Sequence, residues 1–457
     1  MQPSAKVSAS INRFLHTPRY IIAAALISLA AHILSAELVA YTLFAAVAVY
    51  VALHSDDLLP LTPLFLFCYI TPSANNNPGR NEASVFSGWR GLWILALGMA
   101  IVVCLAYFII RNRKRFFSAR LRLLPGMLIL CGAYLLSGIG SDAYPAYLKQ
   151  NLIYCLLQCG CLLIPYFLLC GGVRWQQVQR NYLAWTGVCG GFLILAQIFC
   201  CYLAGDILVN GSIDRVNIFT GWGMYNNIGA LLAMMIPFAF SLGLSSRKVW
   251  LGLLIGSIFL GGVLLTCSRG SILTGVPIFC ICLFLLIRYA HNRKHTYYYL
   301  IGFILICILG FFFMRKTLSQ WFSHLLSKGL DPNTRDDIYT QGIRLFKKAP
   351  ILGNSFFSTG YVPWDFSTVD SLSAVIPPRW HNTVIQLLVC TGVVGLLAYL
   401  VHRIQTLWLF WKRRSRENAF ILLSICVLLF TSLLDCHFFN LGPVLFYSVM
   451  LAFAEHK

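Results

Sequence analysis

Three basic residues lie where an otherwise apolar chain becomes briefly polar, and their side chains could bind an anion and move a proton. Arg269 occupies a polar break of a few residues between two apolar runs, where burying an arginine is costly without a partner. Arg335 falls in the first turn of a helix predicted over 335–348, whose free N–H groups and positive dipole end favour an anion. His381 stands just before another apolar run, and histidine can exchange a proton near neutral pH. We therefore take these three residues as the leading site candidates.

Several of these polar residues also have a purely structural interpretation. Arg269 could extend to the outer membrane interface, and His381 could be an ordinary polar interface residue. Lys347 and Lys348 are expected to complement the negative end of the predicted helix and to touch lipid headgroups. Asp435 and His437, which lie between the last two apolar runs, could support the site or cap a helix end.

A metal site or a bound cofactor is not expected. Asp336 and Asp337 are neighbours, and side chains one residue apart on a helix diverge by about 100°, so ion pairing with a nearby arginine is the preferred interpretation. Nearly all of the 17 cysteines lie inside apolar runs and are expected to pack as small hydrophobic residues. Pairs such as Cys159 and Cys161 lack the further ligands that zinc requires.

The elements that must position these residues are membrane helices. Of the 457 residues, 58% are hydrophobic and only 11% are charged, which excludes a water-soluble fold. We predict an all-α, polytopic integral membrane protein that forms a single domain over 1–457, with about 12–14 transmembrane helices. Fourteen candidate spans follow from hydropathy, and twelve remains an alternative because several are short, including the first three. The candidates are 20–34, 38–53, 58–70, 91–110, 123–139, 151–170, 183–204, 227–245, 249–266, 271–287, 297–314, 383–401, 419–434 and 438–454.

The charges predict the orientation of these spans. With the N-terminus in the cytoplasm, the inward segments carry 22 Lys and Arg against 4 Asp and Glu, and the outward segments carry 13 against 11. Both termini are then cytoplasmic, and the chain is a multi-pass protein of the cytoplasmic (inner) membrane. The basic clusters are expected to meet anionic membrane lipids rather than nucleic acid. One large extracytoplasmic loop with short helices, 315–382, carries Arg335 and His381, so the site faces outward.

Four short motifs in a fixed order resemble the superfamily of O-antigen ligases and O-antigen polymerases, which are bacterial membrane glycosyltransferases. The resemblance covers roughly 215–400. The motifs are Gly223-Met224-Tyr225-Asn226-Asn227; Ser268-Arg269-Gly270; Arg335 with Ile338-Tyr339 and Pro350-Ile351-Leu352-Gly353; and His381-Asn382 followed by Gly392 and Gly395. The family often has a second glycine two residues after the position of Gly353, where this chain has Ser355.

The resemblance implies transfer of a glycan from an undecaprenyl-diphosphate carrier to an acceptor hydroxyl at the outer face of the cytoplasmic membrane, without a metal ion. By this resemblance Arg269 and Arg335 bind the diphosphate, and His381 is the catalytic base or positions the acceptor. Asn382, Asp435 and His437 are possible supporting residues. A neutral histidine can take the acceptor proton, so activity is expected to fall when His381 is protonated. The acceptor could be another glycan, as in a polymerase, or a lipid A core, as in a ligase.

Two other classes of protein are possible. A polysaccharide flippase or other transporter would have a similar number of spans, but ion-coupled transporters place ionisable groups deep in their helices. The predicted spans contain almost none, with His32 the nearest. A scaffold for envelope assembly, which has no chemistry of its own, would tolerate alanine at Arg269, Arg335 and His381.

Overall fold

The structure is a computed structural model of the whole chain, and its described residues include all six candidate site residues. It describes residues 3–73, 88–141, 145, 148–179, 181–204, 208–209, 212–213, 215–305, 308, 312, 315, 335–356 and 379–456. Much of the predicted outer loop lies outside these residues, including Asn333 and Thr334, a pair of residue types that can cap the helix predicted over 335–348. The same is true of most of the second half of the predicted span 297–314.

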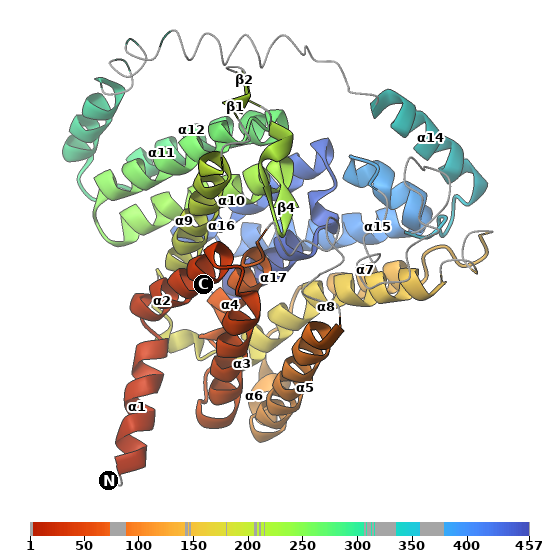
Figure 1. Cartoon of the computed structure of the whole chain (residues 1–457), viewed down its shortest axis with the longest axis horizontal. Helices are drawn as coiled ribbons and strands as arrows, with labels where there is room; N and C mark the ends of the chain where they lie inside the picture. Colours follow the sequence, from red (N-terminus) through yellow and green to blue (C-terminus); the bar gives the residue numbers. More distant parts are fainter. Residues whose placement is uncertain are drawn as a thin grey trace.

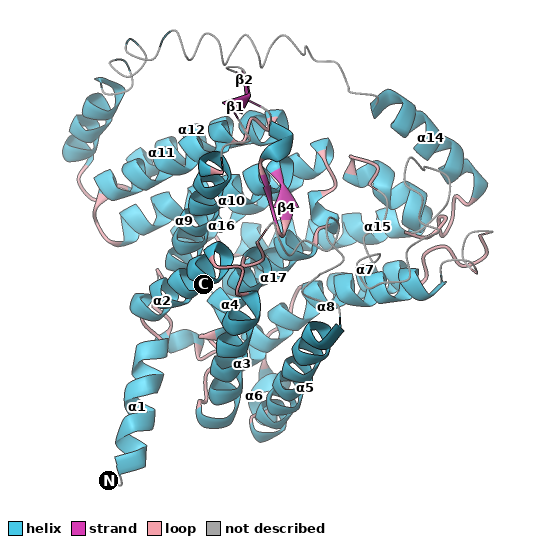
Figure 2. Ribbon diagram, in the orientation of Figure 1, coloured by secondary structure: helices cyan, strands magenta, loops and turns pink. Residues whose placement is uncertain are grey.

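The described chain is almost entirely helical (Figure 2). The long and short α-helices are α1 Pro3–Leu15, α2 Pro18–Ile33, α3 Glu37–His54, α4 Leu61–Ile70, α5 Gly88–Arg111, α6 Arg113–Ser118, α7 Leu124–Leu135, α8 Leu148–Gly172, α9 Tyr182–Leu203, α10 Tyr225–Ser245, α11 Val249–Leu265, α12 Arg269–Tyr289, α14 Arg335–Lys348, α15 Thr383–Lys412, α16 Arg416–Leu434 and α17 Leu441–His456. Three-residue 3-10 helices are η2 Trp175–Gln177, η3 Arg215–Asn217 and η6 His437–Phe439. Two antiparallel pairs of two-residue strands, β1 Leu208–Val209 with β2 Ser212–Ile213 and β3 Phe219–Thr220 with β4 Gly223–Met224, precede α10.

The helices confirm the predicted all-α membrane fold. Eight of the described helices are long and apolar enough to cross a membrane, or up to nine if the bent pair Ala9–Leu15 and Pro18–Ile33 counts as one span. Four more apolar helices have only 10–17 residues: α4, α7, α11 and α17. Each is shorter than the roughly 20 residues that a perpendicular helix needs to cross the hydrocarbon core.

Helix α10 forms the centre of the bundle. In its most apolar stretch 89% of the residues are buried, and it packs against α9, α11, α12 and α16 (Figure 1). Small residues permit this closeness: a Cβ added at Gly243 would lie 2.7 Å from the Cα of Gly252. Helix α5 is mostly exposed: only 6% of its apolar stretch is buried, and it packs mainly on α3. Its exposed apolar surface is the kind that lipid chains cover.

The ends of the helices divide into two groups, one of which we name the basic end. There Arg115 donates to the carbonyl oxygens of Gly171 (2.8 Å), Gly172 (2.7 Å) and Asp56 (2.7 Å), and Arg174 pairs with the Asp56 carboxylate at 2.9 Å. These contacts tie together the end of α8 and the segments that follow α3 and α5. The segments that follow α3, α5 and α8 therefore meet at one end of the bundle.

The opposite group, which we name the site end, contains the first turns of α10, α12 and α15 and the segment between α16 and α17. The Asn227 amide there lies 3.1 Å from that of Asn440, the residue before α17. All six candidate site residues lie at this end or, for Arg335, on α14, which packs on the first half of α15 (Figure 1).

Helix α15 is broken at Gly392, where the backbone takes φ 63° and ψ −163°. The loop that follows α14 fills the break: Val393 N–H donates to Pro350 O (2.9 Å), Val394 N–H to Ile351 O (3.2 Å), and Asn354 N–H to Val389 O (2.8 Å). The backbone groups freed by the break are thus satisfied by another segment, as buried polar groups require.

The second half of α15 corrects one prediction from the sequence. The predicted span ended at residue 401 and left His402 and Arg403 in an inward segment, but α15 continues to Lys412 with both side chains buried. Arg403 donates to Tyr447 Oη at 2.7 Å, and its guanidinium lies 4.2–4.9 Å from the ring centres of Phe438, Tyr399 and Tyr447. Hydropathy missed the pair because aromatic contacts offset part of the penalty of burying a cation.

Candidate functional site

Helix α14 positions Arg335, and its observed bounds, Arg335–Lys348, are the predicted ones. The helix docks through the buried side chain of Ile338 and through Gly342, where an added Cβ would lie 2.9 Å from Ile385 and 3.1 Å from Trp380. Tyr339, one turn after Arg335, donates to the carbonyl oxygen of His381 at 3.2 Å. Half-buried Arg335 is therefore on a helix fixed directly to the histidine segment.

A three-residue turn between α11 and α12 positions Arg269. Cys267 adopts the left-handed φ of 52° that ends many helices, and Ser268 then caps α12, accepting from Ser271 N–H. The Ser268 hydroxyl also donates to Asn226 Oδ1 at 2.9 Å. Arg269 is thus the first residue of α12 and is held beside the start of α10.

The turn that carries His381 is fixed on both sides. Trp380 N–H donates to Gln386 Oε1 at 2.9 Å, and Asn382 Oδ1 accepts from Val384 N–H at 2.8 Å as the cap of α15. The Asn382 amide also donates to Leu433 O at 3.0 Å, which joins α15 to the end of α16. His381 itself has φ 51°, a left-handed conformation that is strained for a non-glycine residue and is frequent at functional sites.

The central contact of the site joins His381 to Asp435. His381 Nδ1 lies 3.1 Å from Asp435 Oδ1, which also accepts from Cys436 N–H at 2.9 Å. The other oxygen, Asp435 Oδ2, accepts from the Asn226 amide at 3.3 Å. Burial alone would raise the pKa of the Asp435 carboxyl, but the hydrogen bond from His381, the charges of His437 and His381 and the Cys436 N–H together hold it well below its usual range. Asp435 is therefore ionised and holds the His381 ring in one orientation. A carboxylate bonded to Nδ1 also selects the tautomer that carries its proton on Nδ1.

His437 is buried beside this pair, and its backbone N–H donates to the carbonyl oxygen of Asp435 at 2.8 Å. Its Nδ1 lies 3.4 Å from the Asn440 amide, at the start of α17. Burial lowers the pKa of His437, Asp435 raises it, and the charges of Arg379, His381 and Arg335 lower it further, so the ring is neutral around pH 7. Arg335 of α14, Arg379 and His381 thus all act on the His437 ring, together with the Asp435 carboxylate.

The structure therefore brings four sequence motifs to one place. Asn226, at the start of α10, forms hydrogen bonds with Ser268 and with Asp435. Asp435 in turn contacts His381, whose carbonyl oxygen accepts from Tyr339 of α14. Arg269 is next to Gly270, where an added Cβ would lie 3.3 Å from Leu434, the residue before Asp435.

Sequence reasoning did not assign roles to three residues of this site: Asn226, Tyr339 and Arg379. Asn226 and Tyr339 were within the motifs, and Tyr339 falls one turn from Arg335, which was a usable signal. Arg379 stands two residues before His381, and its partial burial could not be read from that position.

Ser355 lies where the family often has a second glycine, and its φ of 71° is the left-handed value that glycine adopts readily. The turn therefore keeps the conformation that a glycine would favour. A Cβ added at Gly138 would lie 2.5 Å from Ser355 Cβ, so the strained turn is packed tightly against the end of α7.

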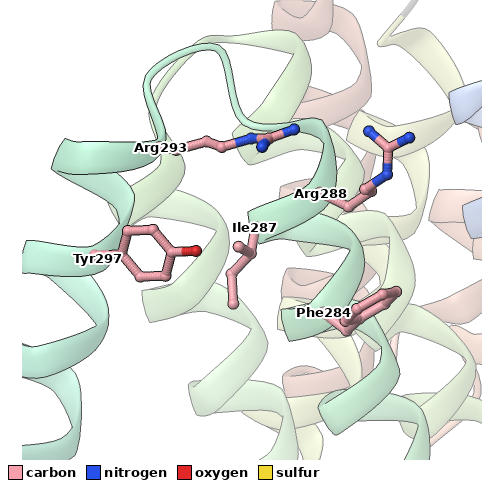
Figure 3. Close-up of a pocket in the computed structure, with 5 residues that line it drawn as sticks. All are labelled: Phe284, Ile287, Arg288, Arg293 and Tyr297. Atoms are coloured by element: carbon pink, nitrogen blue, oxygen red, sulfur yellow. The ribbon is translucent and has the colours of Figure 1, made fainter.

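A hollow of about 360 Å³ lies at the other end of α12, lined by Phe284, Ile287, Arg288, Arg293 and Tyr297 (Figure 3). Figure 3 shows the Tyr297 hydroxyl pointing toward Ile287. Because α12 has 21 residues, this hollow is roughly 30 Å from Arg269. It therefore has no part in the site described above.

Metal-ligating groups do not gather in the described part of the chain. No three His, Cys, Asp or Glu residues there could share one ion, and Asp336 is exposed on α14. The side chain of Asp337 lies outside the described residues.

The fold defines a polytopic helical membrane protein, and at one end of it a histidine is paired with a carboxylate. Residues 254–400 match a family model described as O-antigen ligase. This match confirms the resemblance to the O-antigen ligase and polymerase superfamily over that segment, which carries Arg269, Arg335 and His381, and it supports a ligase-type or polymerase-type glycosyltransferase function. Asn226 and Asp435 lie outside the matched residues. No curated protein matches the chain.

Proposed function

We propose that this protein transfers a glycan from an undecaprenyl-diphosphate carrier to an acceptor hydroxyl at the outer face of the cytoplasmic membrane, without a metal ion. The observation that carries the proposal is the His381–Asp435 contact, because it sets a proton-accepting ring beside two anion-binding helix starts. The site end then faces outward, and both chain termini face the cytoplasm.

The roles of the residues follow from their contacts. Asp435 accepts the Nδ1 proton of His381, so the ring presents the lone pair of Nε2. Nε2 takes the proton of the acceptor hydroxyl while its oxygen bonds to C1 of the donor sugar. The bond from C1 to the phosphate oxygen breaks, and undecaprenyl diphosphate leaves with the bonding electron pair.

Arg269 and Arg335 bind that leaving group. A planar guanidinium suits two phosphoryl oxygens, and it stabilises the charge that develops on them most strongly where water is excluded. The proton on His381 afterwards passes to solvent or to the diphosphate, which returns the ring to its neutral form. Asn382 and His437 act by holding the backbone around His381 and Asp435.

The test replaces Arg269, Arg335 and His381 one at a time by alanine in a deletion strain complemented with the full chain. We expect each variant to insert into the membrane normally and to lose transfer by at least about a hundredfold. Lipid-linked glycans extracted from each strain report the activity, because the unused donor accumulates.

Arg344→Ala is the matched control, since Arg344 is an exposed arginine on the same helix as Arg335. It should keep full transfer. Full activity in all three site variants would overturn the proposal and favour a scaffold.

The same extracts separate the two members of the superfamily. Single repeat units on the carrier would identify a polymerase, and long chains stranded on the carrier would identify a ligase. A flippase would instead leave its lipid-linked glycan on the inner leaflet, protected from enzymes added outside the cell membrane. This comparison with a flippase is needed because His402 and Arg403 are buried within α15, and transporters place ionisable groups inside their helices.

A further inference from the structure

Arg379 is a half-buried arginine that the proposed reaction does not yet use. It precedes Trp380, whose side chain is 1% exposed and whose N–H is held by Gln386. The backbone beside Arg379 is therefore fixed, so the guanidinium projects from a fixed point of the chain near the site.

The charge of Arg379 is kept although its side chain is partly removed from solvent. Burial alone would lower the pKa of Arg379, but Tyr154, Cys436 and Asp435 act in the opposite direction and the pKa is raised. The guanidinium is therefore a full positive charge, and these neighbours place it between α8 and the segment that follows α16.

Part of this guanidinium has no partner. Nη1 is buried, and no hydrogen bond to it is formed within the described part of the chain. The nearby carboxylate of Asp435 is already engaged, through Oδ1 with His381 and Cys436 and through Oδ2 with Asn226. A buried donor without an acceptor is costly, so the site is expected to receive an acceptor from a ligand.

The balance of charge shows what kind of ligand this would be. Arg335 and Arg379 both act on His437, and Asp435 is the one carboxylate that acts on the same ring. Two guanidinium groups against one carboxylate leave a surplus of positive charge, which suits an anion with several oxygen atoms.

We propose that Arg379 is a third anion-binding residue of the site and that its free Nη1 donates to a phosphoryl oxygen of the lipid diphosphate. The inference rests on the proposed function and adds a specific contact to it. It makes Arg379 a binding residue, not a residue that only supports Asp435.

The test measures binding of undecaprenyl diphosphate to the purified full-length protein in nanodiscs, so no acceptor or sugar needs to be known. We expect Arg379→Gln to weaken binding roughly tenfold to a hundredfold, as loss of a hydrogen bond to a charged group does. Arg344→Gln is the matched control and should bind like the wild type. Unchanged binding by Arg379→Gln would overturn the inference.

Arg379→Lys is the second variant, in case glutamine prevents folding. It keeps the charge but loses the planar fork, so we expect binding between that of the wild type and that of Arg379→Gln. If Arg379→Gln does not fold but Arg379→Lys folds and binds undecaprenyl diphosphate as tightly as the wild type, this result would count against a directed contact from Nη1.

The two proposals fail in different ways. If Arg269→Ala and His381→Ala retain transfer, the proposed function itself is wrong. The other case is that Arg269→Ala, His381→Ala and Arg379→Gln all lose transfer, but Arg379→Gln still binds undecaprenyl diphosphate normally. Arg379 then has only a positioning role, and the contact proposed here is wrong.

Discussion

At the scale of single residues, the site depends on one carboxylate with three hydrogen-bond donors around it. Asp435 receives hydrogen bonds from His381, Cys436 and Asn226, which belong to three separate parts of the chain. In the proposed reaction, a histidine held in this way presents its other nitrogen to the acceptor, so the effect of removing the carboxylate should exceed the effect of losing one surface charge.

We predict that Asp435→Asn lowers transfer by about a hundredfold to ten-thousandfold, because the amide no longer selects the required tautomer of His381. The same variant should lower the stability of the purified protein at pH 7 by about 1–3 kcal/mol. Transfer is measured from the lipid-linked glycans, and stability from thermal unfolding in detergent.

The pH dependence of that stability difference has a definite sign. The folded pKa of Asp435 is depressed, so its contribution is complete above the unfolded value, about 3.9, and is lost as the pH falls below it. The gap in melting temperature between wild type and Asp435→Asn should therefore be constant from pH 7 to 5 and narrow below pH 4. A gap that widens in acid would show that the carboxylate is not stabilised by its partners.

At the scale of elements, the site depends on the break in α15. The loop after α14 enters this break, so α14 and Arg335 are held against the helix that begins just after His381. Gly392 makes the break possible, since φ 63° with ψ −163° is accessible almost only to glycine. An added Cβ there would also lie 2.2 Å from Ile351 O.

We predict that Gly392→Ala destabilises the protein by at least about 2 kcal/mol and reduces transfer, because α14 loses its docking surface. Gly98→Ala is the matched control: Gly98 lies in α5, and a Cβ there would have no atom within 4 Å. That control should change stability by less than about 1 kcal/mol. Equal melting temperatures for the two variants would mean that the break does not depend on glycine.

At the scale of the whole molecule, the two ends of the bundle differ in chemistry. The basic end carries Arg115 and Arg174 around Asp56, and the site end carries the His381–Asp435 pair. Basic residues at membrane helix ends are retained on the cytoplasmic side. In the orientation that we propose, this asymmetry places the site at the outer face of the membrane.

We predict that green fluorescent protein fused after Lys457 is fluorescent and that alkaline phosphatase fused there is inactive, as for a cytoplasmic terminus. Alkaline phosphatase fused after Lys348, at the end of α14, should be active, because the proposed orientation places that residue outside. The reverse pattern would place the site in the cytoplasm and would contradict the proposed reaction.

The sequence by itself determined the features that depend on local patterns. Hydropathy predicted the membrane class, helical periodicity predicted α14 with its observed bounds, and the order of short motifs indicated the superfamily. The tertiary structure alone decided which of the polar residues meet. His381 and Asp435 are 54 positions apart, and their contact follows from how α15 packs on α16. The surroundings of Arg379 and Arg403 could not be predicted either, because the groups that act on them, such as Tyr154 on Arg379 and Phe438 on Arg403, come from distant segments of the chain.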